Sequence, residues 1–319
     1  MSAIAPQVPT PRDSATAVSL VVIVGLLMQA GSAVAVLVIH AVGVAEALWL
    51  RTALAALILA AVRPRLVRLP GKGDRLPLVA LTLSLLAMNF SFYEAISRAP
   101  VGVVVAIEFL GPLGVAVAGS RRILDGLWVV LAAAGIALLA KPGGTVSVDG
   151  LLFALLAAAC WAAFILSAKR TVRTVGSLRA TILMLVGSAV LLTPVFLATG
   201  VKVAGHTRAL LLGLAVAVLS SALPYALELA AIRRVRPSTY GVLLSIEPAI
   251  AALWGFVILS QRLAVRELFG IVAIVLAAAG AAWTSSADLP RPRRRGGGAR
   301  SAADETGGSA GAAGEKAAG

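Results

Sequence analysis

The sequence has few charged residues and a single cysteine. Charged residues make up 13% of the 319-residue chain, hydrophobic residues make up 60%, and the mean hydropathy is +0.97. A soluble globular protein is nearer a quarter charged and half apolar. The composition therefore excludes an ordinary soluble enzyme and, apart from the chain ends, a disordered protein. The one cysteine, Cys160, cannot form an intramolecular disulfide.

Sequence patterns that hold nucleotides, metals or catalytic groups are also missing. The chain contains no Gly-x-x-x-x-Gly-Lys-Ser/Thr loop, no His-Glu-x-x-His helix, no Cys/His metal pattern and no Gly-x-Ser-x-Gly turn. We therefore expect no ATP hydrolysis, no other enzymatic activity, no cofactor and no metal. The net charge is +14. The basic residues lie mostly between apolar segments, so they indicate membrane topology rather than a nucleic-acid partner.

Apolar segments long enough to span a membrane recur along the chain. A transmembrane helix needs about 20 mostly apolar residues. The windows that meet this requirement are Ser14–Ile39, 44–62 (with Arg51), Leu76–Tyr93, 101–120 (with Glu108), Gly126–Ala140, Gly150–Ala168, Ala180–Val201, Ala209–Leu227, 237–260 (with Glu247) and Leu268–Ala287. The predicted fold class is all-α: a multi-pass membrane protein with ten transmembrane helices.

The basic residues of the loops predict how the helices are oriented. With the N-terminus in the cytoplasm, the inside segments hold 21 Lys and Arg residues and the outside loops hold six. Cytoplasmic loops carry the excess of Lys and Arg, so both termini are predicted to be cytoplasmic. The polar residues 1–15 and the basic, Gly-, Ala- and Ser-rich residues 285–319 are predicted to be disordered.

The two halves of the chain resemble each other weakly. Residues 95–98 (Ala-Ile-Ser-Arg) return at 231–234 (Ala-Ile-Arg-Arg), and in the same register Pro112 falls on Pro248. Each half would hold five helices, and this odd number gives the second half the opposite orientation. Inverted repeats are the architecture of many secondary transporters, which bind their substrate near the membrane midplane. The two predicted repeats are residues 16–141 and 150–284.

Ionisable residues inside the spans are the main functional candidates, because each costs at least about 2.5–3.5 kcal/mol to insert. Glu108 and Glu247 lie near the middle of their helices beside prolines, and a proline frees a backbone carbonyl that can face a cavity. Two acids at helix breaks suggest a cation or proton site. Arg51 can hold a carboxylate with two hydrogen bonds. The alternative is that Arg51 forms a structural ion pair with one or both glutamates.

Other polar residues share helix faces and would line a polar cavity if they face inward. The alternative for each is a hydrogen bond between helices. The candidate substrate- and proton-binding residues are Gln29, Arg51, Asn89, Tyr93, Glu108, Trp161, Ser221, Tyr225, Glu228, Tyr240 and Glu247. The candidate helix-break residues are Gly111, Pro112, Pro224 and Pro248.

Several short motifs surround these candidates. They are Met88-Asn89-Phe90-Ser91-Phe92-Tyr93, Ala106-Ile107-Glu108-Phe109-Leu110-Gly111-Pro112, Ser120-Arg121-Arg122, Ala159-Cys160-Trp161-Ala162, Ser221-Ala222-Leu223-Pro224-Tyr225 and Glu247-Pro248-Ala249. In these motifs, and over about residues 17–284, the chain resembles the EamA-type drug/metabolite transporters, and more narrowly their threonine/homoserine exporter branch. The resemblance implies a ten-helix inner-membrane carrier with two inverted repeats that exports small amino acids at the expense of the proton gradient. One departure is Ser260-Gln261, where relatives often have Gly-Glu.

The predicted function is export of threonine- or homoserine-like amino acids, or related metabolites, by proton antiport with alternating access. Removal from water favours the protonated form of a carboxylic acid, so Glu108 and Glu247 would exchange a proton for the substrate ammonium while Arg51 holds the substrate carboxylate. The alternatives are a carrier of other metabolites or lipophilic drugs, including an importer, and a membrane sensor or scaffold. The expected partners are the small-molecule substrate, protons and membrane lipid.

Overall fold

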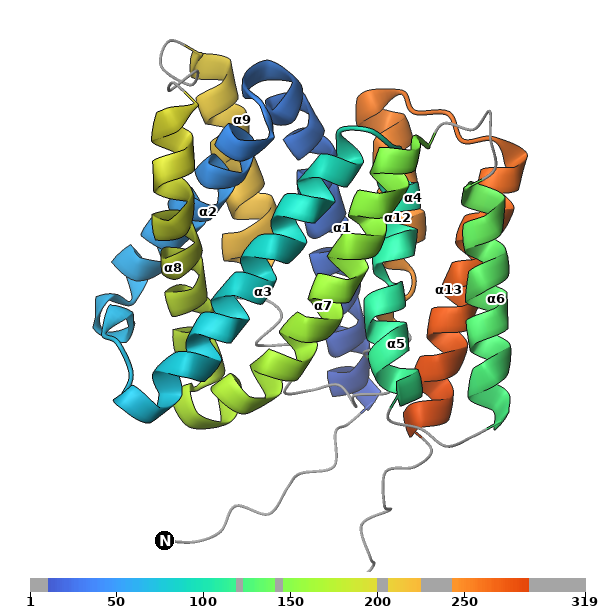
Figure 1. Ribbon diagram of the computed structural model, residues 1–319, viewed down its shortest axis with the longest axis horizontal. Coiled ribbons are helices and arrows are strands. Elements are labelled where there is room, and N and C mark those ends of the chain that lie inside the picture. Colours follow the sequence, from blue (N-terminus) through green and yellow to red (C-terminus); the bar gives the residue numbers. More distant parts are fainter. Residues whose placement is uncertain (1–10, 119–122, 141–145, 200–205, 225–242, 287–319) are drawn as a thin grey trace, which may run out of the picture. The chain divides into compact units, whose positions relative to one another are not determined.

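The computed structural model describes residues 11–118, 123–140, 146–199, 206–224 and 243–286, and these residues are almost entirely helical (Figure 1). The helices are α1 (Pro11–Val42), α2 (Val44–Val62), α3 (Lys72–Ile96), α4 (Val101–Glu108), α5 (Leu110–Ala118), α6 (Ile123–Leu139), α7 (Val148–Val175), α8 (Ser177–Ala198), α9 (Thr207–Ala217), α12 (Glu247–Leu259) and α13 (Val265–Ser286). A 3₁₀ turn, η1 (Pro64–Val67), follows α2, and a π-helix, η2 (Val218–Ala222), follows α9.

Among the described residues, seven helical segments are long and apolar enough to cross a membrane, with α4 and α5 counted together as one. The three remaining predicted spans correspond to the shorter apolar helices Asp125–Leu139, Thr207–Ala222 and Glu247–Leu259. The prediction of an all-α membrane protein with ten apolar helical segments is therefore confirmed.

The predicted boundaries differ from the observed ones in three places. Helix α1 already begins at Pro11, and α13 continues to Ser286, so the ends of both predicted disordered segments are helical. Proline is well suited to the first turn of a helix because its missing N–H has no partner there anyway. The predicted window 237–260 is not one continuous helix, because a turn at 245–246 precedes α12. Residues 1–10, 225–242 and 287–319 lie outside the described part.

Helices that are distant in sequence pack in pairs. Helix α3 runs beside α7, α6 beside α13, α2 beside α8, and α1 against both α12 and α9 (Figure 1). The short helix α4 lies in the interior, since every residue from Val101 to Ile107 is buried. A helix that is apolar on all sides is stable only when other helices surround it. Helix α4 packs on α12, α7 and α13.

The contact between α4 and α12 leaves no room for a side chain at Gly102. A Cβ atom added to Gly102 would lie 2.6 Å from the Cβ of Ala252 and 2.7 Å from its Cα. Next to this contact, the backbone N–H of Val101 donates to Oε1 of Gln261 at 3.1 Å. Ser260, which ends α12, has φ 54° and so adopts the left-handed conformation that turns the chain toward α4. These contacts hold one end of α4 to one end of α12.

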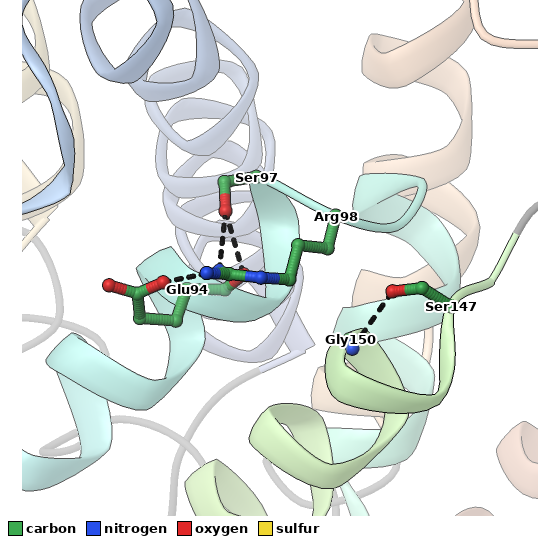
Figure 2. A network of polar contacts seen from close by, with 5 residues as sticks. All are labelled: Glu94, Ser97, Arg98, Ser147 and Gly150. Atoms are coloured by element: carbon green, nitrogen blue, oxygen red, sulfur yellow. Dashed lines mark hydrogen bonds and ion pairs between the residues drawn. The ribbon is translucent and has the colours of Figure 1, made fainter.

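Figure 2 shows two sets of polar contacts, one at the end of α3 and one at the start of α7. Arg98 forms an ion pair with Glu94 and also donates to the hydroxyl of Ser97 at 2.9 Å. Its guanidinium lies 5.0 Å from the ring centre of Phe153 on α7. The hydroxyl of Ser147 caps α7 by accepting from the backbone N–H of Gly150 at 3.0 Å.

Candidate functional site

Glu108 is the last residue of α4, at the junction with α5. Pro112 has no N–H to donate to the carbonyl of Glu108, four residues earlier, so the helical hydrogen-bond pattern is broken at this point. The side chain of Glu108 is partly buried and lines a cavity of about 190 Å³. The interruption therefore places a carboxylate and a backbone carbonyl at the same depth inside the bundle.

Glu247 is the first residue of α12, where the first N–H groups of a helix carry a partial positive charge that favours a carboxylate. Its side chain is 8% exposed, and its Oε2 accepts a hydrogen bond of 3.1 Å from Nε2 of Gln29 on α1. Pro248 occupies the first turn of α12, where no N–H is needed. Because α4 and α12 pack together, their two terminal glutamates line the same cavity.

Arg51 reaches the cavity from α2 and is held by neutral groups. Its Nη1 donates to Oδ1 of Asn89 at 3.0 Å, its Nε to the hydroxyl of Ser221 at 3.3 Å, and its Nη2 to the carbonyl of Ser220 at 3.4 Å. Nδ2 of Asn89 donates to the carbonyl of Leu85 at 3.0 Å, which directs its Oδ1 toward Arg51. The guanidinium also lies 5.7 Å from the ring centre of Tyr93.

The π-helix η2 explains why a backbone carbonyl is available to Arg51. Pro224 has no N–H with which to form the α-helical hydrogen bond to Ser220, and a π-turn adds one residue to the helical turn at this point. Both Ser220 and Ser221 are buried; Ser220 lines the cavity, and the hydroxyl of Ser221 accepts from Arg51. Helix distortions are frequent at functional sites.

The cavity is lined by two acidic residues and one basic residue, and most of its other lining residues are apolar. Arg51 and Glu247 are both within electrostatic range of Glu108. Phe109 and Trp161 meet edge to face in the wall, with ring centres 5.2 Å apart and an interplanar angle of 87°. The lining residues are Val24, Met28, Gln29, Ser32, Arg51, Leu85, Met88, Asn89, Phe92, Val105, Glu108, Phe109, Trp161, Phe164, Ser220, Leu244 and Glu247.

The structure brings together many of the residues that the sequence proposes, but not all of them. Those that line the cavity are Gln29, Arg51, Asn89, Glu108, Trp161 and Glu247. Tyr93 and Ser221 are buried behind Arg51 rather than in the cavity wall. Tyr225, Glu228 and Tyr240 lie outside the described residues.

The predicted helix-break residues Gly111 and Pro112 lie directly after the interruption between α4 and α5. Both residues lie inside α5, and the interruption comes earlier, at Phe109. The reason is that a proline disturbs the bond to the residue four positions before it. Gly111 has a different role: a Cβ atom there would collide with the backbone carbonyl of Ala158, so the glycine lets α5 approach α7 closely.

Sequence reasoning did not find the apolar wall or Ser220. Leu85, Met88 and Phe92 lie on one face of α3 at helical spacing, as does Asn89. In an apolar helix such residues do not differ in polarity from their neighbours. Only the polar Asn89 indicated which face of the helix points inward. Ser220 was missed because the π-turn changes which serine faces the cavity.

These features define a multi-pass membrane protein with a charged central cavity at helix interruptions, which is the architecture of a membrane carrier. Comparison with known proteins agrees with this class. A sequence model of the EamA-like transporter family matches residues 148–283. Proteins named threonine/homoserine exporter RhtA, from Escherichia coli strain K12 and Salmonella typhimurium strain LT2, are each 40% identical over 261 residues, which is 81% of this chain and 88% of theirs.

The chain belongs to the EamA-like transporter family. It is a multi-pass transporter of the cell membrane and not an enzyme. A solved crystal structure of another protein has the same fold, with a TM-score of 0.55 and 18% identity, over 86% of this chain and 99% of that one.

Proposed function

We propose that the protein exports small amino acids, of the threonine and homoserine type, in exchange for protons. The observation that carries this proposal is one cavity lined by an arginine, held by neutral groups, and by two glutamates at helix ends. An amino-acid zwitterion has the complementary charges. The names of the relatives, threonine/homoserine exporters, support the same substrate class.

Substrate binding follows from the chemistry of the cavity walls. Arg51 presents a planar fork of donors that suits the substrate carboxylate, and Asn89 and the Ser220 carbonyl keep this fork in place. Glu108 and Glu247 bind the substrate ammonium, and the face of Trp161 lies in the same wall. A cavity of about 190 Å³ suits a small amino acid rather than a large lipophilic drug.

Proton coupling arises because the carboxylates cannot hold a proton and the ammonium at the same time. A proton that arrives from the outside neutralises a carboxylate, which weakens its attraction for the ammonium and releases the substrate there. When the cavity faces the cytoplasm, proton loss restores the charge and a new substrate binds. Competition for one site in this way couples the two movements in opposite directions.

Alternating access would come from two inverted halves, residues 16–141 and 150–284, with both termini in the cytoplasm. The helix pairing supports this arrangement: α2 with α8, α4 with α12 and α6 with α13 join corresponding helices of the two halves, and the α3–α7 contact has its counterpart in the contact of α1 with α9. The family match over residues 148–283 supports the boundaries of the second half. The basic residues support this orientation, because 21 Lys and Arg residues lie in the segments assigned to the cytoplasm and six lie in the outside loops.

Transport by the purified protein in liposomes tests the proposal. We expect a pH gradient to drive threonine against its concentration in wild-type liposomes, and Glu108→Gln and Glu247→Gln to remove this proton-driven accumulation. Glu94→Gln is the matched control, because Glu94 lies outside the cavity and pairs with Arg98. If the cavity variants accumulate threonine as fast as the control, or if wild-type liposomes move lipophilic cations instead of threonine, the proposal is wrong.

A further inference from the structure

A second cavity of about 390 Å³ lies on the surface between the start of α3 and the end of α7, and none of its lining residues lines the central cavity. Its walls are Leu76, Pro77 and Ala80 of α3 and Leu166, Ser167 and Arg170 of α7. Leu76 is 78% exposed and Leu166 is 58% exposed. In a membrane protein such exposed leucines contact lipid chains. We refer to this cavity as the α3–α7 groove.

The charged residues around the α3–α7 groove indicate where it lies relative to the membrane. Helix α3 is charged in its first turn, at Lys72, Asp74 and Arg75, and is apolar from Leu76 onward. The last turns of α7 carry Lys169, Arg170 and Arg173. The groove therefore lies where the apolar spans end, at the level of the lipid headgroups. Its surroundings carry five basic residues and one acid.

Polar groups inside the groove remain available for a ligand. Arg170 forms no hydrogen bond and no ion pair with the part of the chain that the structure describes. Pro77 has no N–H to donate to the carbonyl of Gly73, which also lines the groove. The hydroxyl of Ser167 donates to the carbonyl of Ala163 at 2.8 Å, so its oxygen can still accept. One cation and two acceptors thus face an apolar floor.

We propose that the α3–α7 groove binds an anionic glycerophospholipid with a hydroxylated headgroup, such as phosphatidylglycerol. The phosphate contacts Arg170, the headgroup hydroxyls donate to the Gly73 carbonyl and to Ser167, and an acyl chain lies along Leu76, Ala80 and Leu166. Charge complementarity selects this occupant, because basic clusters at membrane interfaces attract anionic lipid and a cationic headgroup would be repelled.

Native mass spectrometry of the purified full-length protein measures this binding directly. Phosphatidylglycerol and phosphatidylcholine with identical acyl chains are each added at increasing concentration, and the fraction of protein with one bound lipid is recorded. We expect the wild type to prefer phosphatidylglycerol. Arg170→Gln should weaken phosphatidylglycerol binding about fivefold, as expected for one arginine near an anionic headgroup.

Two matched controls separate the groove from general charge and hydrophobicity. Arg173→Gln removes the same charge from α7 at a residue that does not line the groove, and it should weaken binding less than Arg170→Gln because Arg173 does not contact the bound phosphate. Ala80→Trp fills the groove without changing the charge and should weaken binding, whereas Val79→Trp, on the neighbouring exposed position, should not.

Equal losses for Arg170→Gln and Arg173→Gln, or unchanged binding in both Arg170→Gln and Ala80→Trp, would overturn the proposal. Competition by free glycerol phosphate at the concentration of the lipid would also contradict it, because the site would then recognise a soluble anion and not a lipid. Each variant is compared with the wild type by gel filtration, so that a folding defect is recognised before the binding result is interpreted.

Discussion

The close contact between α4 and α12 gives a stability prediction whose size follows from the structure. Gly102→Ala adds a Cβ atom 2.6 Å from the Cβ of Ala252, whereas carbon atoms in contact prefer a separation of about 3.5–4.0 Å. The two helices must move apart by about 1 Å. Overpacking of this kind costs about 1–3 kcal/mol, and we expect the free energy of unfolding to fall by that amount.

Gly126→Ala is the control, because a Cβ atom at Gly126 of α6 has no neighbouring atom within 4 Å. The same substitution there should raise the free energy of unfolding by up to about 1 kcal/mol, since alanine favours the helix. Both values are measured by denaturing the purified protein with sodium dodecyl sulfate in mixed micelles and following tryptophan fluorescence. If Gly102→Ala is as stable as Gly126→Ala, the account of the α4–α12 contact is wrong.

Three further predictions concern single contacts. Arg51→Lys should raise the KM for threonine transport at least about tenfold, because lysine cannot reproduce the bidentate fork; an unchanged KM in liposomes would exclude Arg51 from substrate binding. Gln261→Ala should lower the free energy of unfolding by about 1 kcal/mol, because the Val101 N–H loses its acceptor; Gln261→Glu keeps an acceptor and should lose less in the same denaturation assay. Ser147→Ala should cost about 1 kcal/mol through loss of the α7 cap, and Thr199→Ala, at the exposed end of α8, should cost less.

The membrane helices were predictable because a long uncharged apolar segment is typical of a membrane span and rare in a soluble protein. Seven of the predicted windows correspond to long apolar helices and three to shorter ones among the described residues. The glutamates and Arg51 stood out because an ionisable side chain contrasts strongly with an apolar span. Their common cavity could not be read from the sequence, because it depends on how α2, α4 and α12 pack.

Backbone irregularities were only partly predicted. Pro112 indicated an interruption beside Glu108, and the helix is interrupted at Phe109 because the lost hydrogen bond is the one to the carbonyl of Glu108. The π-turn at η2 was not predicted, so the sequence did not reveal that Ser220 rather than Ser221 lines the cavity. The sequence could not decide whether Arg51 forms an ion pair with a glutamate. In the structure, Arg51 forms hydrogen bonds to neutral groups.

The central claim is that substrate and protons compete for the carboxylates of the cavity. It is tested most directly by adding threonine to the purified protein in weakly buffered detergent solution and measuring the proton release with a pH-sensitive dye. We predict that threonine releases protons from the wild type and that the double variant Glu108→Gln, Glu247→Gln releases none. Threonine binding without proton release from the wild type, or an unchanged release from the double variant, would contradict the account.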